Sequence, residues 1–455
     1  MNDNIYDNIP WGLSPDTSAA EEESLPRSGR MIDNTTRPER VLMVAVAQGD
    51  PEETERSLAE LKELIRTAGG EAVGSVVQAR EKIHPGTYVG TGKLEEVADA
   101  VTALDVDTVI CDDELSPAQY NNLSDALAAK VMDRTMLILD IFAARARTAE
   151  GKIQVELAQL RYRSARLIGL GKSLSRLGGG IGTRGPGEKK LEMDRRLIGK
   201  RISVLKKELE EVRRHRDLIR GRRREGGVKV AAIVGYTNAG KSTLLNHLTG
   251  AGVLEEDALF ATLDPTTRSL TLPGGNEILL TDTVGFIHKL PHHLIEAFRS
   301  TLEEAANADL ILHVVDASNP EMSHQMEVVY ETLDELGAGG KTVYTLFNKT
   351  DRLEDTDLND EIHLTDRRAD QCWRISARTG EGLEELMKGL EDYLMSGQVL
   401  FEGVIPYTQG GLTARIRAEG TLLGESYEAE GIFVKAMLPA ALYGQVTAEL
   451  ARNAK

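Results

Sequence analysis

The 455-residue sequence has few cysteines, few aromatic residues and no long apolar run. Its two cysteines, Cys111 and Cys372, lie far apart in apolar segments typical of strands, which favours two buried thiols over a disulfide or a metal site. No segment approaches the ~18 consecutive apolar residues that a membrane span needs. The acidic, polar first residues do not fit a signal peptide. The sequence therefore predicts a cytoplasmic protein without a membrane span.

The pattern of apolar residues divides the chain into five segments of a multi-domain α/β protein. Residues 1–38 are acidic and polar, which predicts a disordered tail. Alternating strand and helix patterns predict an N-terminal α/β subdomain with a parallel sheet at 39–150 and a doubly wound, mostly parallel sheet at 228–398. Apolar residues at helical spacing predict a helical hairpin at 151–227, with a glycine-rich tip at 169–187. A small α+β domain is expected at 399–455.

Several elements are specific enough to be checked individually. In the first α/β segment we expect strands at 41–47, 108–111 and 136–141 and a helix at 57–68. In the last segment we expect strands at 412–416 and 431–434 and a helix at 439–451.

One segment of the chain has the pattern of a phosphate-binding loop. An apolar strand at 228–234 leads into Gly235-Tyr236-Thr237-Asn238-Ala239-Gly240-Lys241-Ser242, which matches G-x-x-x-x-G-K-[ST], and a helical pattern begins at Thr243. The backbone N–H groups of such a loop surround phosphate oxygens at a helix N-terminus. Lys241 is expected to reach the β- and γ-phosphates, and Ser242 to bind Mg²⁺.

Two further segments have the spacing of nucleotide switches. Asp282-Thr283-Val284-Gly285 follows a strand, so Asp282 is expected to be the second Mg²⁺ anchor and the Gly285 N–H to sense the γ-phosphate. Phe260-Ala261-Thr262-Leu263-Asp264 lies between the two motifs, and one threonine there should close over the metal. Thr262 is the predicted ligand, with Thr266 and Thr267 as alternatives. Lys241, Thr262 and Gly285 are the predicted catalytic groups.

The base-reading residues are predicted at the ends of two later strands. Asn348-Lys349-Thr350-Asp351 follows a strand at 342–347, and Asp351 can accept hydrogen bonds from guanine N1–H and the exocyclic amine. Ser376-Ala377-Arg378 follows the next strand, which places the Ala377 N–H near the guanine carbonyl. Four ordered motifs at strand ends predict a GTPase.

Hydrolysis by the isolated protein is expected to be slow. Phe286 follows Gly285, where Ras-like GTPases have a glutamine that orients water. A phenyl ring cannot orient water, so activation by a partner or by a rearranged loop is expected.

The hairpin segment is strongly basic although the whole chain has a net charge of -18. Residues 145–224 contain 24 Lys+Arg and 9 Asp+Glu, a net charge of +15, and the rest of the chain has a net charge of −33. A basic arm with a flexible tip suits folded RNA, where phosphates and shape dominate recognition. The alternative is a solvated face whose charges pair with the acidic domains. The predicted RNA contacts are Arg176, Arg184, Lys189, Lys190, Arg195 and Arg196.

These residues together resemble the HflX family of translational GTPases. The likeness covers roughly 40–455 and is carried by the stretches at 85–93, 112–117, 150–160, 175–188, 260–268 and 282–286. The resemblance implies binding to the large ribosomal subunit in the GTP state and dissociation of stalled or idle ribosomes under stress. It also implies a monomer that is partly ribosome-associated. A GTPase that remodels ribosomal RNA and a non-ribosomal regulatory GTPase remain alternatives.

Overall fold

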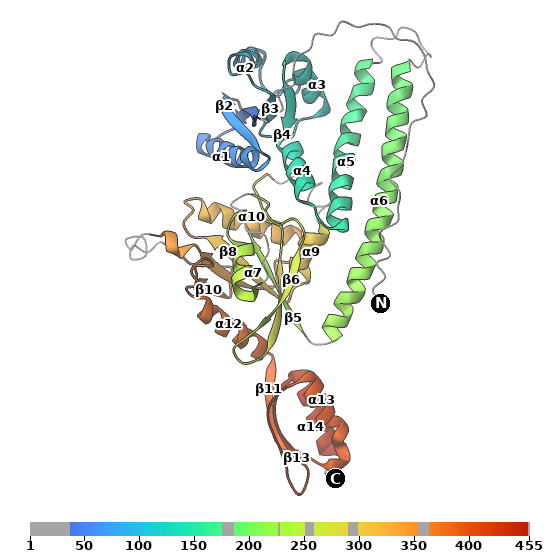
Figure 1. Cartoon of the computed structure of the whole chain (residues 1–455), viewed down its shortest axis with the longest axis vertical. Coiled ribbons are helices and arrows are strands. Elements are labelled where there is room, and N and C mark those ends of the chain that lie inside the picture. Colours follow the sequence, from blue (N-terminus) through green and yellow to red (C-terminus); the bar gives the residue numbers. More distant parts are fainter. Residues whose placement is uncertain are drawn as a thin grey trace. The chain divides into compact units, whose positions relative to one another are not determined.

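The computed structural model describes residues 37–174, 186–225, 228–250, 259–289, 299–353 and 364–453 (Figure 1). Contacts separate residues 1–38 from residues 39–455, and the second unit is described below. The predicted disordered tail and most of the glycine-rich tip lie outside the described residues. Within these ranges, no helix has both the length and the apolar character needed to cross a lipid bilayer.

The first sheet is parallel, with strand order β2-β1-β3-β4. Its strands are β1 (Glu39–Ala47), β2 (Gly70–Ala79), β3 (Thr108–Cys111) and β4 (Lys130–Asp133). Its helices are α1 (Pro51–Thr67), α2 (Thr91–Ala103), α3 (Pro117–Ala126) and α4 (Arg134–Arg145). α1 and α4 pack on one face and α2 and α3 on the other. The predicted parallel sheet is confirmed.

The predicted strand at 136–141 is wrong, because this run lies in helix α4. The Asp133 carboxylate accepts a hydrogen bond from the Met136 N–H at 2.9 Å and caps the helix. Residues 137–139, 141 and 142 are all buried, so the helix is apolar on nearly every side. A short continuous apolar run does not by itself distinguish a buried strand from a buried helix.

Two long helices form the basic hairpin, α5 (Ala149–Leu174) and α6 (Pro186–Glu225), which lie side by side (Figure 1). Leu157, Leu205 and Leu209 are buried between them. Arg201 on α6 forms two hydrogen bonds of 2.7 and 2.8 Å to the Glu156 carboxylate on α5. The apolar repeat that predicted a hairpin therefore forms the seam between the helices.

The second sheet has six strands in the order β10-β9-β8-β5-β7-β6, and only β6 is antiparallel to its neighbour. The strands are β5 (Lys229–Gly235), β6 (Thr266–Thr271), β7 (Glu277–Asp282), β8 (Leu310–Asp316), β9 (Thr342–Asn348) and β10 (Gln371–Arg374). The helices are α7 (Lys241–Thr249), α9 (Arg299–Asn307), α10 (Met322–Glu335) and α12 (Leu383–Met395), with the short η1 (Thr350–Arg352). α9 and α10 cover one face, and α7 and α12 the other. The predicted doubly wound sheet is confirmed.

The two cysteines differ in their surroundings. Cys111 on β3 is buried as expected, whereas Cys372 is exposed. The prediction for Cys372 is wrong because β10 is the edge strand of its sheet and three of its four residues are exposed.

The C-terminal segment is a three-stranded antiparallel sheet with helices on one face. Its elements are β11 (Gln398–Ile405), η2 (Tyr407–Gln409), α13 (Gly410–Glu419), β12 (Thr421–Tyr427), β13 (Ile432–Pro439) and α14 (Ala440–Asn453). The expected strand near 431–434 and the final helix are present. The expected strand at 412–416 is wrong: Leu412 and Ile416, four residues apart, are buried on one side of helix α13.

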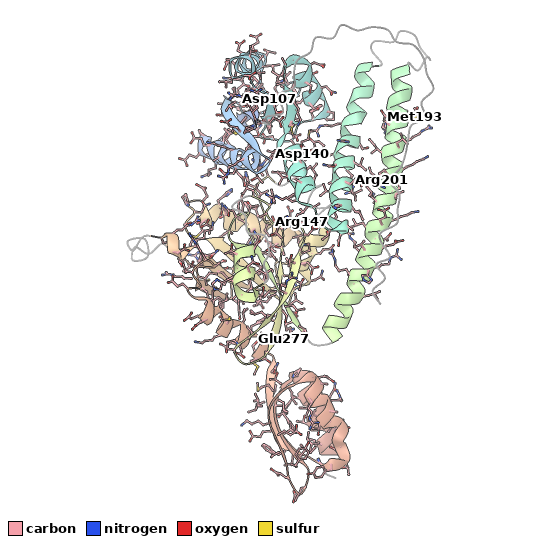
Figure 2. The ribbon with its side chains drawn as sticks, viewed as in Figure 1. Asp107, Asp140, Arg147, Met193, Arg201 and Glu277 are labelled. Atoms are coloured by element: carbon pink, nitrogen blue, oxygen red, sulfur yellow. The ribbon has the colours of Figure 1, made fainter. Side chains whose placement is uncertain are left out.

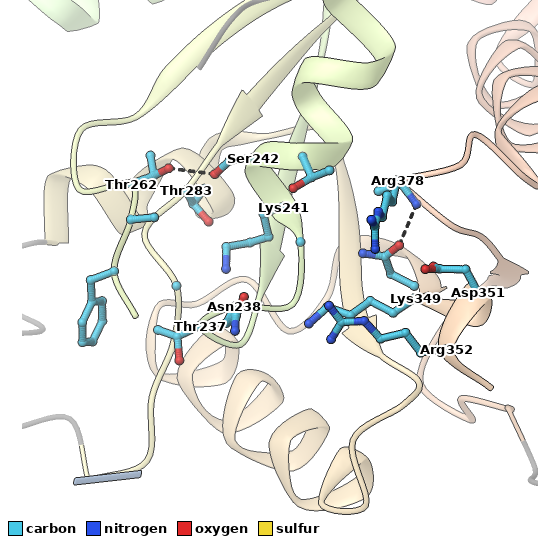
Figure 3. Close-up of a pocket in the computed structure, with 17 residues that line it drawn as sticks. Thr237, Asn238, Lys241, Ser242, Thr262, Thr283, Lys349, Asp351, Arg352 and Arg378 are labelled. Carbon is cyan, nitrogen blue, oxygen red and sulfur yellow. Dashed lines mark hydrogen bonds between the residues drawn. The ribbon is translucent and has the colours of Figure 1, made fainter. Parts of the chain in front are cut away.

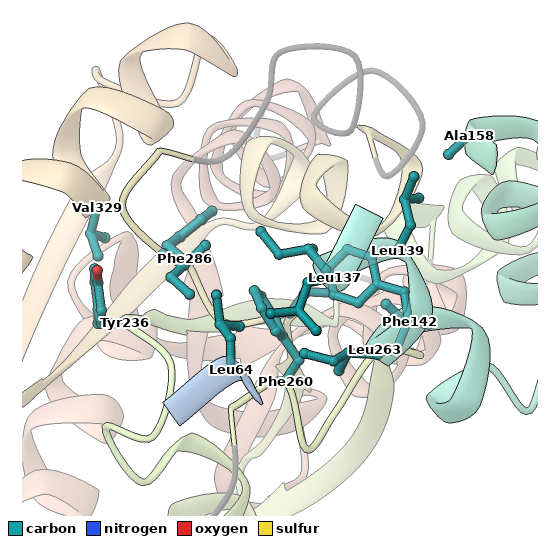
Figure 4. Packing of buried hydrophobic residues seen from close by; sticks show 14 of the residues in the cluster. Leu64, Leu137, Leu139, Phe142, Ala158, Tyr236, Phe260, Leu263, Phe286 and Val329 are labelled. Carbon is teal, nitrogen blue, oxygen red and sulfur yellow. The ribbon is translucent and has the colours of Figure 1, made fainter. Parts of the chain in front are cut away.

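One apolar cluster joins the first sheet to the second (Figure 4). Phe142 from α4 and Phe260, before β6, pack edge to face with ring centroids 4.7 Å apart. Leu64, Leu263 and Phe286 are also buried in this cluster. Residues beside the predicted nucleotide site therefore also pack against the N-terminal helices.

Candidate nucleotide-binding site

A cavity of about 360 Å³ opens at the carboxyl ends of the parallel strands in the second sheet (Figure 3). In an open α/β sheet, this edge is where ligands bind. The lining residues are Thr237, Asn238, Gly240, Lys241, Ser242, Thr243, Phe260, Ala261, Thr262, Thr283, Gly285, Asn348, Lys349, Asp351, Arg352, Ala377 and Arg378. Thus the structure brings all four sequence motifs to one site.

The loop between β5 and α7 has the backbone conformation that its glycines permit. Gly240, at the N-cap of α7, has a φ of 97°, and a Cβ there would clash with the Asn348 side chain. A Cβ on Gly235 would clash with the Val314 carbonyl. Because both positions tolerate only a hydrogen in place of a side chain, the loop can surround phosphate oxygens with its N–H groups.

Lys241 is buried at the base of this loop. Its Nζ donates hydrogen bonds to the carbonyls of Tyr236 at 2.7 Å and Gly235 at 3.1 Å. Burial lowers its pKa from 10.5 to about 8, although the Asp282 carboxylate favours the charged form. Among the described residues, the hydrogen-bond partners of the Lys241 ammonium group are neutral carbonyl oxygens. A negatively charged phosphate oxygen would stabilise its charge further.

Three oxygen-bearing side chains from different elements meet beside Lys241. The Ser242 hydroxyl donates to Asp282 Oδ2 at 2.7 Å, and its oxygen lies 2.7 Å from Thr262 Oγ1 (Figure 3). Asp282 is fully buried, burial raises its pKa, and its Oδ1 has no hydrogen-bond partner among the described residues. A hard oxygen donor set with one unsatisfied buried carboxylate oxygen fits Mg²⁺. The alternatives Thr266 and Thr267 lie in β6, where Thr267 Oγ1 is 3.0 Å from Thr281 Oγ1.

Asn348 connects the phosphate loop to the base-reading loop. Its Nδ2 donates to the Ala239 carbonyl at 2.8 Å, and its Oδ1 accepts from the Ala377 N–H at 2.9 Å. The side chain is 2% exposed. Asn348 therefore fixes the spacing between the two loops.

Asp351 lines the same cavity in an orientation set by its neighbours. Its Oδ1 accepts a hydrogen bond of 2.7 Å from the Ser376 hydroxyl, which also accepts from the Thr379 N–H at 3.1 Å. Lys349, with a φ of 65°, donates to Asp316 Oδ2 at 2.7 Å. The carboxylate is thus presented on a fixed loop, as base recognition requires.

The second switch segment pairs directly with the phosphate loop. The Phe286 N–H donates to the Gly235 carbonyl at 3.2 Å, and the Thr237 N–H donates to the Phe286 carbonyl at 2.8 Å. A Cβ on Gly285 would lie 2.8 Å from the Thr237 side chain and 3.0 Å from Lys241 Nζ. The Gly285 backbone is thus positioned where a terminal phosphate would lie against the loop.

Three family models match consecutive parts of the chain. They are described as GTP-binding GTPase N-terminal at residues 55–143, GTP-binding GTPase Middle Region at 145–223 and 50S ribosome-binding GTPase at 230–349. A GTPase HflX from Lacrimispora saccharolytica is 62% identical over 91% of this chain and 96% of its own length. The chain belongs to the HflX family of GTPases. Its reaction is the hydrolysis of GTP.

Other HflX relatives cover the same extent. The GTPase HflX of Escherichia coli is 42% identical over 88% of this chain and 93% of its own length. A solved GTP-binding protein from Sulfolobus solfataricus in complex with GDP aligns with 24% identity and a TM-score of 0.41, over 78% of this chain and 99% of that chain.

Not every predicted nucleotide residue lines the cavity. The predicted residues that are not among its lining residues are Gly235, Tyr236, Ala239, Leu263, Asp264, Asp282, Val284, Thr350 and Ser376. Some of them still hold the site: Asp282 bonds Ser242, and the Thr350 hydroxyl donates to the Ile375 carbonyl at 3.0 Å. The Tyr236 hydroxyl points away, because it donates to Glu60 on α1 and accepts from the His288 N–H at 2.8 Å.

Arg352 is a lining residue that the motif analysis missed. It follows Asp351 on η1, and Figure 3 shows its side chain beside that of Lys349. In the sequence, the signal for this residue was a cation directly after Asp351, the predicted base selector.

The predicted RNA contacts are only partly described. Arg176 and Arg184 lie outside the described residues, as do the side chains of Lys189 and Lys190. Arg195 and Arg196 are exposed on α6, and Arg196 forms an i,i+4 ion pair of 3.0 Å with Glu192.

Proposed function

We propose that this HflX GTPase acts as a monomeric, GTP-controlled factor that binds the large ribosomal subunit through its basic hairpin and dissociates stalled or idle ribosomes. The observation that carries this proposal is the exposed cationic surface of α6. Lys200, Lys206, Lys207 and Arg214 are exposed there, together with Arg195. The family description of the 230–349 segment as a 50S ribosome-binding GTPase supports the same partner.

Part of the hairpin's positive charge has a structural use. Arg166 pairs with the buried Asp133 and lies over the Tyr162 ring, 3.5 Å from its centroid. Arg216 pairs with Glu150, and Arg201 with Glu156. These three arginines hold α5 against its neighbours. The exposed cations of α6 are therefore the ones that would bind RNA phosphates. The exposed apolar Met193, on the same helix (Figure 2), adds contact area beside them.

The nucleotide site would hold Mg²⁺ through Ser242, Thr262 and Asp282. The metal, when bound, would neutralise charge on the terminal phosphates. Lys241 would transfer its hydrogen bonds from the loop carbonyls to phosphate oxygens, and the Gly285 N–H would contact the γ-phosphate. Asp351 would select guanine over adenine, because adenine offers no matching pair of donors.

Intrinsic hydrolysis would be slow, because Phe286 follows Gly285 at the position where a glutamine would orient water. The Phe286 ring is 1% exposed within the apolar cluster. Stimulation by the large subunit would supply or rearrange the missing group. A fast turnover by the isolated protein would contradict this part of the proposal.

Cosedimentation with purified large subunits tests the proposal. The wild type should pellet with subunits in the presence of a non-hydrolysable GTP analogue and not with GDP. Lys206→Glu/Lys207→Glu should lose this binding, whereas the charge-matched control Lys62→Glu/Lys388→Glu, at exposed positions on α1 and α12, should retain it. Binding that ignores the nucleotide, or that survives the α6 reversal, would refute the ribosomal reading and favour a regulatory GTPase.

A second assay addresses dissociation. Intact ribosomes incubated with the wild type and GTP should separate into subunits in a sucrose gradient. Subunit binding without separation would favour the alternative of an RNA-remodelling role.

A further inference from the structure

The Asp264 carboxylate lies on the N-terminus of the first hairpin helix. Its Oδ2 accepts hydrogen bonds of 2.9 Å from the N–H groups of both Arg147 and Thr148. Its Oδ1 accepts a 2.5 Å hydrogen bond from the Thr148 hydroxyl, which in turn accepts from the Gly151 N–H at 3.0 Å. A carboxylate at this end of a helix is stabilised by the unpaired N–H groups and the helix dipole. Thr148 is therefore the N-cap of α5, and Asp264, a residue of the first switch, holds this cap in place.

The residues just before Asp264 contact both the nucleotide site and the apolar cluster. Ala261 and Thr262 line the cavity, with Thr262 beside the magnesium-type ligands. Leu263, between Thr262 and Asp264, is 2% exposed in the apolar cluster. Because two residues span at most ~7 Å, Thr262 cannot move far from Ser242 while Leu263 and Asp264 keep their contacts.

We propose that Asp264 is a positioning residue: by binding Arg147 and Thr148 at the start of α5 it holds the first switch in the closed geometry, and so couples the γ-phosphate to the base of the hairpin. The inference rests on the proposed magnesium role of Thr262. When the γ-phosphate is absent, Thr262 loses its reason to stay at the metal. Withdrawal of Thr262 pulls Asp264 away from Arg147 and Thr148, and the N-terminus of α5 loses this anchor.

This coupling is reciprocal. If GTP favours the state in which Asp264 contacts the start of α5, a partner that stabilises this state must increase the preference for GTP over GDP by the same factor. A partner seated on the hairpin would therefore strengthen GTP binding through Asp264, without touching the nucleotide.

Gly151 offers an independent probe of the same contact. A Cβ at this position would clash with Asp264 Oδ1, although alanine is a better helix former than glycine. A merely structural contact predicts that Gly151→Ala changes the stability of the protein but leaves the preference for GTP over GDP unchanged. The positioning role predicts that it weakens GTP binding selectively.

The test measures dissociation constants of a non-hydrolysable GTP analogue and of GDP, with Mg²⁺, on the full chain without ribosomes. Asp264→Ala and Gly151→Ala should each reduce the preference for the GTP analogue about five- to tenfold, because one side-chain contact at a helix N-terminus contributes free energy of this order. GDP affinity should be unchanged. Asp50→Ala removes the N-cap side chain of α1, where Asp50 accepts from the Glu52 N–H, and should leave the preference unaltered.

The double variant closes the argument. If Gly151 acts through Asp264, Gly151→Ala should have no further effect in the Asp264→Ala background. Equal losses for both nucleotides, or additive effects in the double variant, would overturn the proposal. Loss of subunit binding by the wild type would instead refute the proposed function, since the nucleotide preference is measured without ribosomes. GDP binding confirms that each variant is folded, and Gly151→Ala remains decisive should Asp264→Ala fail to fold.

Discussion

Removing the Asn348 side chain should unfasten the two nucleotide loops from each other. Asn348→Ala leaves the Ala377 N–H and the Ala239 carbonyl without their partners at a position that is 2% exposed. An unsatisfied buried polar group costs about 1–3 kcal/mol. Partial access to water from the cavity places the combined loss at about 3 kcal/mol of unfolding free energy. GDP affinity should fall more than tenfold, because binding must then order both loops.

Because Asn348 donates one hydrogen bond and accepts the other, a second substitution tests the prediction more specifically. Asn348→Asp keeps the acceptor for the Ala377 N–H but places a carboxylate oxygen against the Ala239 carbonyl, so it should be at least as harmful as alanine. Asn122→Ala is the control: Asn122 also donates from Nδ2 to a carbonyl, that of Gly86 at 2.7 Å, but it is exposed and remote from the site. Urea unfolding and GDP titration would measure both quantities. A loss below about 1 kcal/mol in Asn348→Ala, similar to the control, would refute the connecting role.

Three further predictions concern the same cavity. Asp351→Asn should weaken GDP binding and favour a xanthine nucleotide, since an amide can donate to the carbonyl that replaces the guanine amine; an unchanged guanine preference in competition binding would show that Asp351 is not the base selector. Gly285→Ala should lower affinity for a GTP analogue while sparing GDP, because the new methyl group would press on Thr237 and Lys241; equal affinities in the variant and the wild type would refute this. Burial lowers the pKa of Lys241 to about 8 in the free protein, and a bound phosphate raises this pKa. GDP binding near pH 8 should therefore take up a proton, and the affinity for GDP should fall as the pH rises further. Calorimetry in two buffers of different ionisation enthalpy should show this proton uptake near pH 8 and much less at pH about 7.

The sequence was sufficient to predict the nucleotide site because its motifs depend on local geometry. A glycine-rich turn between a strand and a helix, or an aspartate at a strand end, has nearly the same meaning in any parallel sheet. Gly240, Lys241, Ser242 and Asp351 therefore lie together as predicted. The hairpin could also be predicted, because its apolar repeat is long enough to distinguish a helix from a strand.

The errors arose where burial on more than one side hides the periodicity. Helix α4 is enclosed by the first sheet, α5 and the apolar cluster, so its sequence lacks a polar face that would show a helical period. The same physics hid the role of Leu263 and Asp264. Their contacts with residues more than 100 positions earlier in the chain cannot be inferred from local spacing.

The packing of Phe286 explains why this position has no side chain that could orient water. From the motif alone, it is only a position without a water-orienting side chain. In the fold, its backbone closes the second switch onto the phosphate loop through Gly235 and Thr237, and its ring fills the cluster shared with Leu64 and Phe260. A glutamine amide there would be buried without partners among apolar side chains, which is costly. The position therefore serves the contact between the N-terminal helices and the second switch, which is consistent with the proposal that another group orients water.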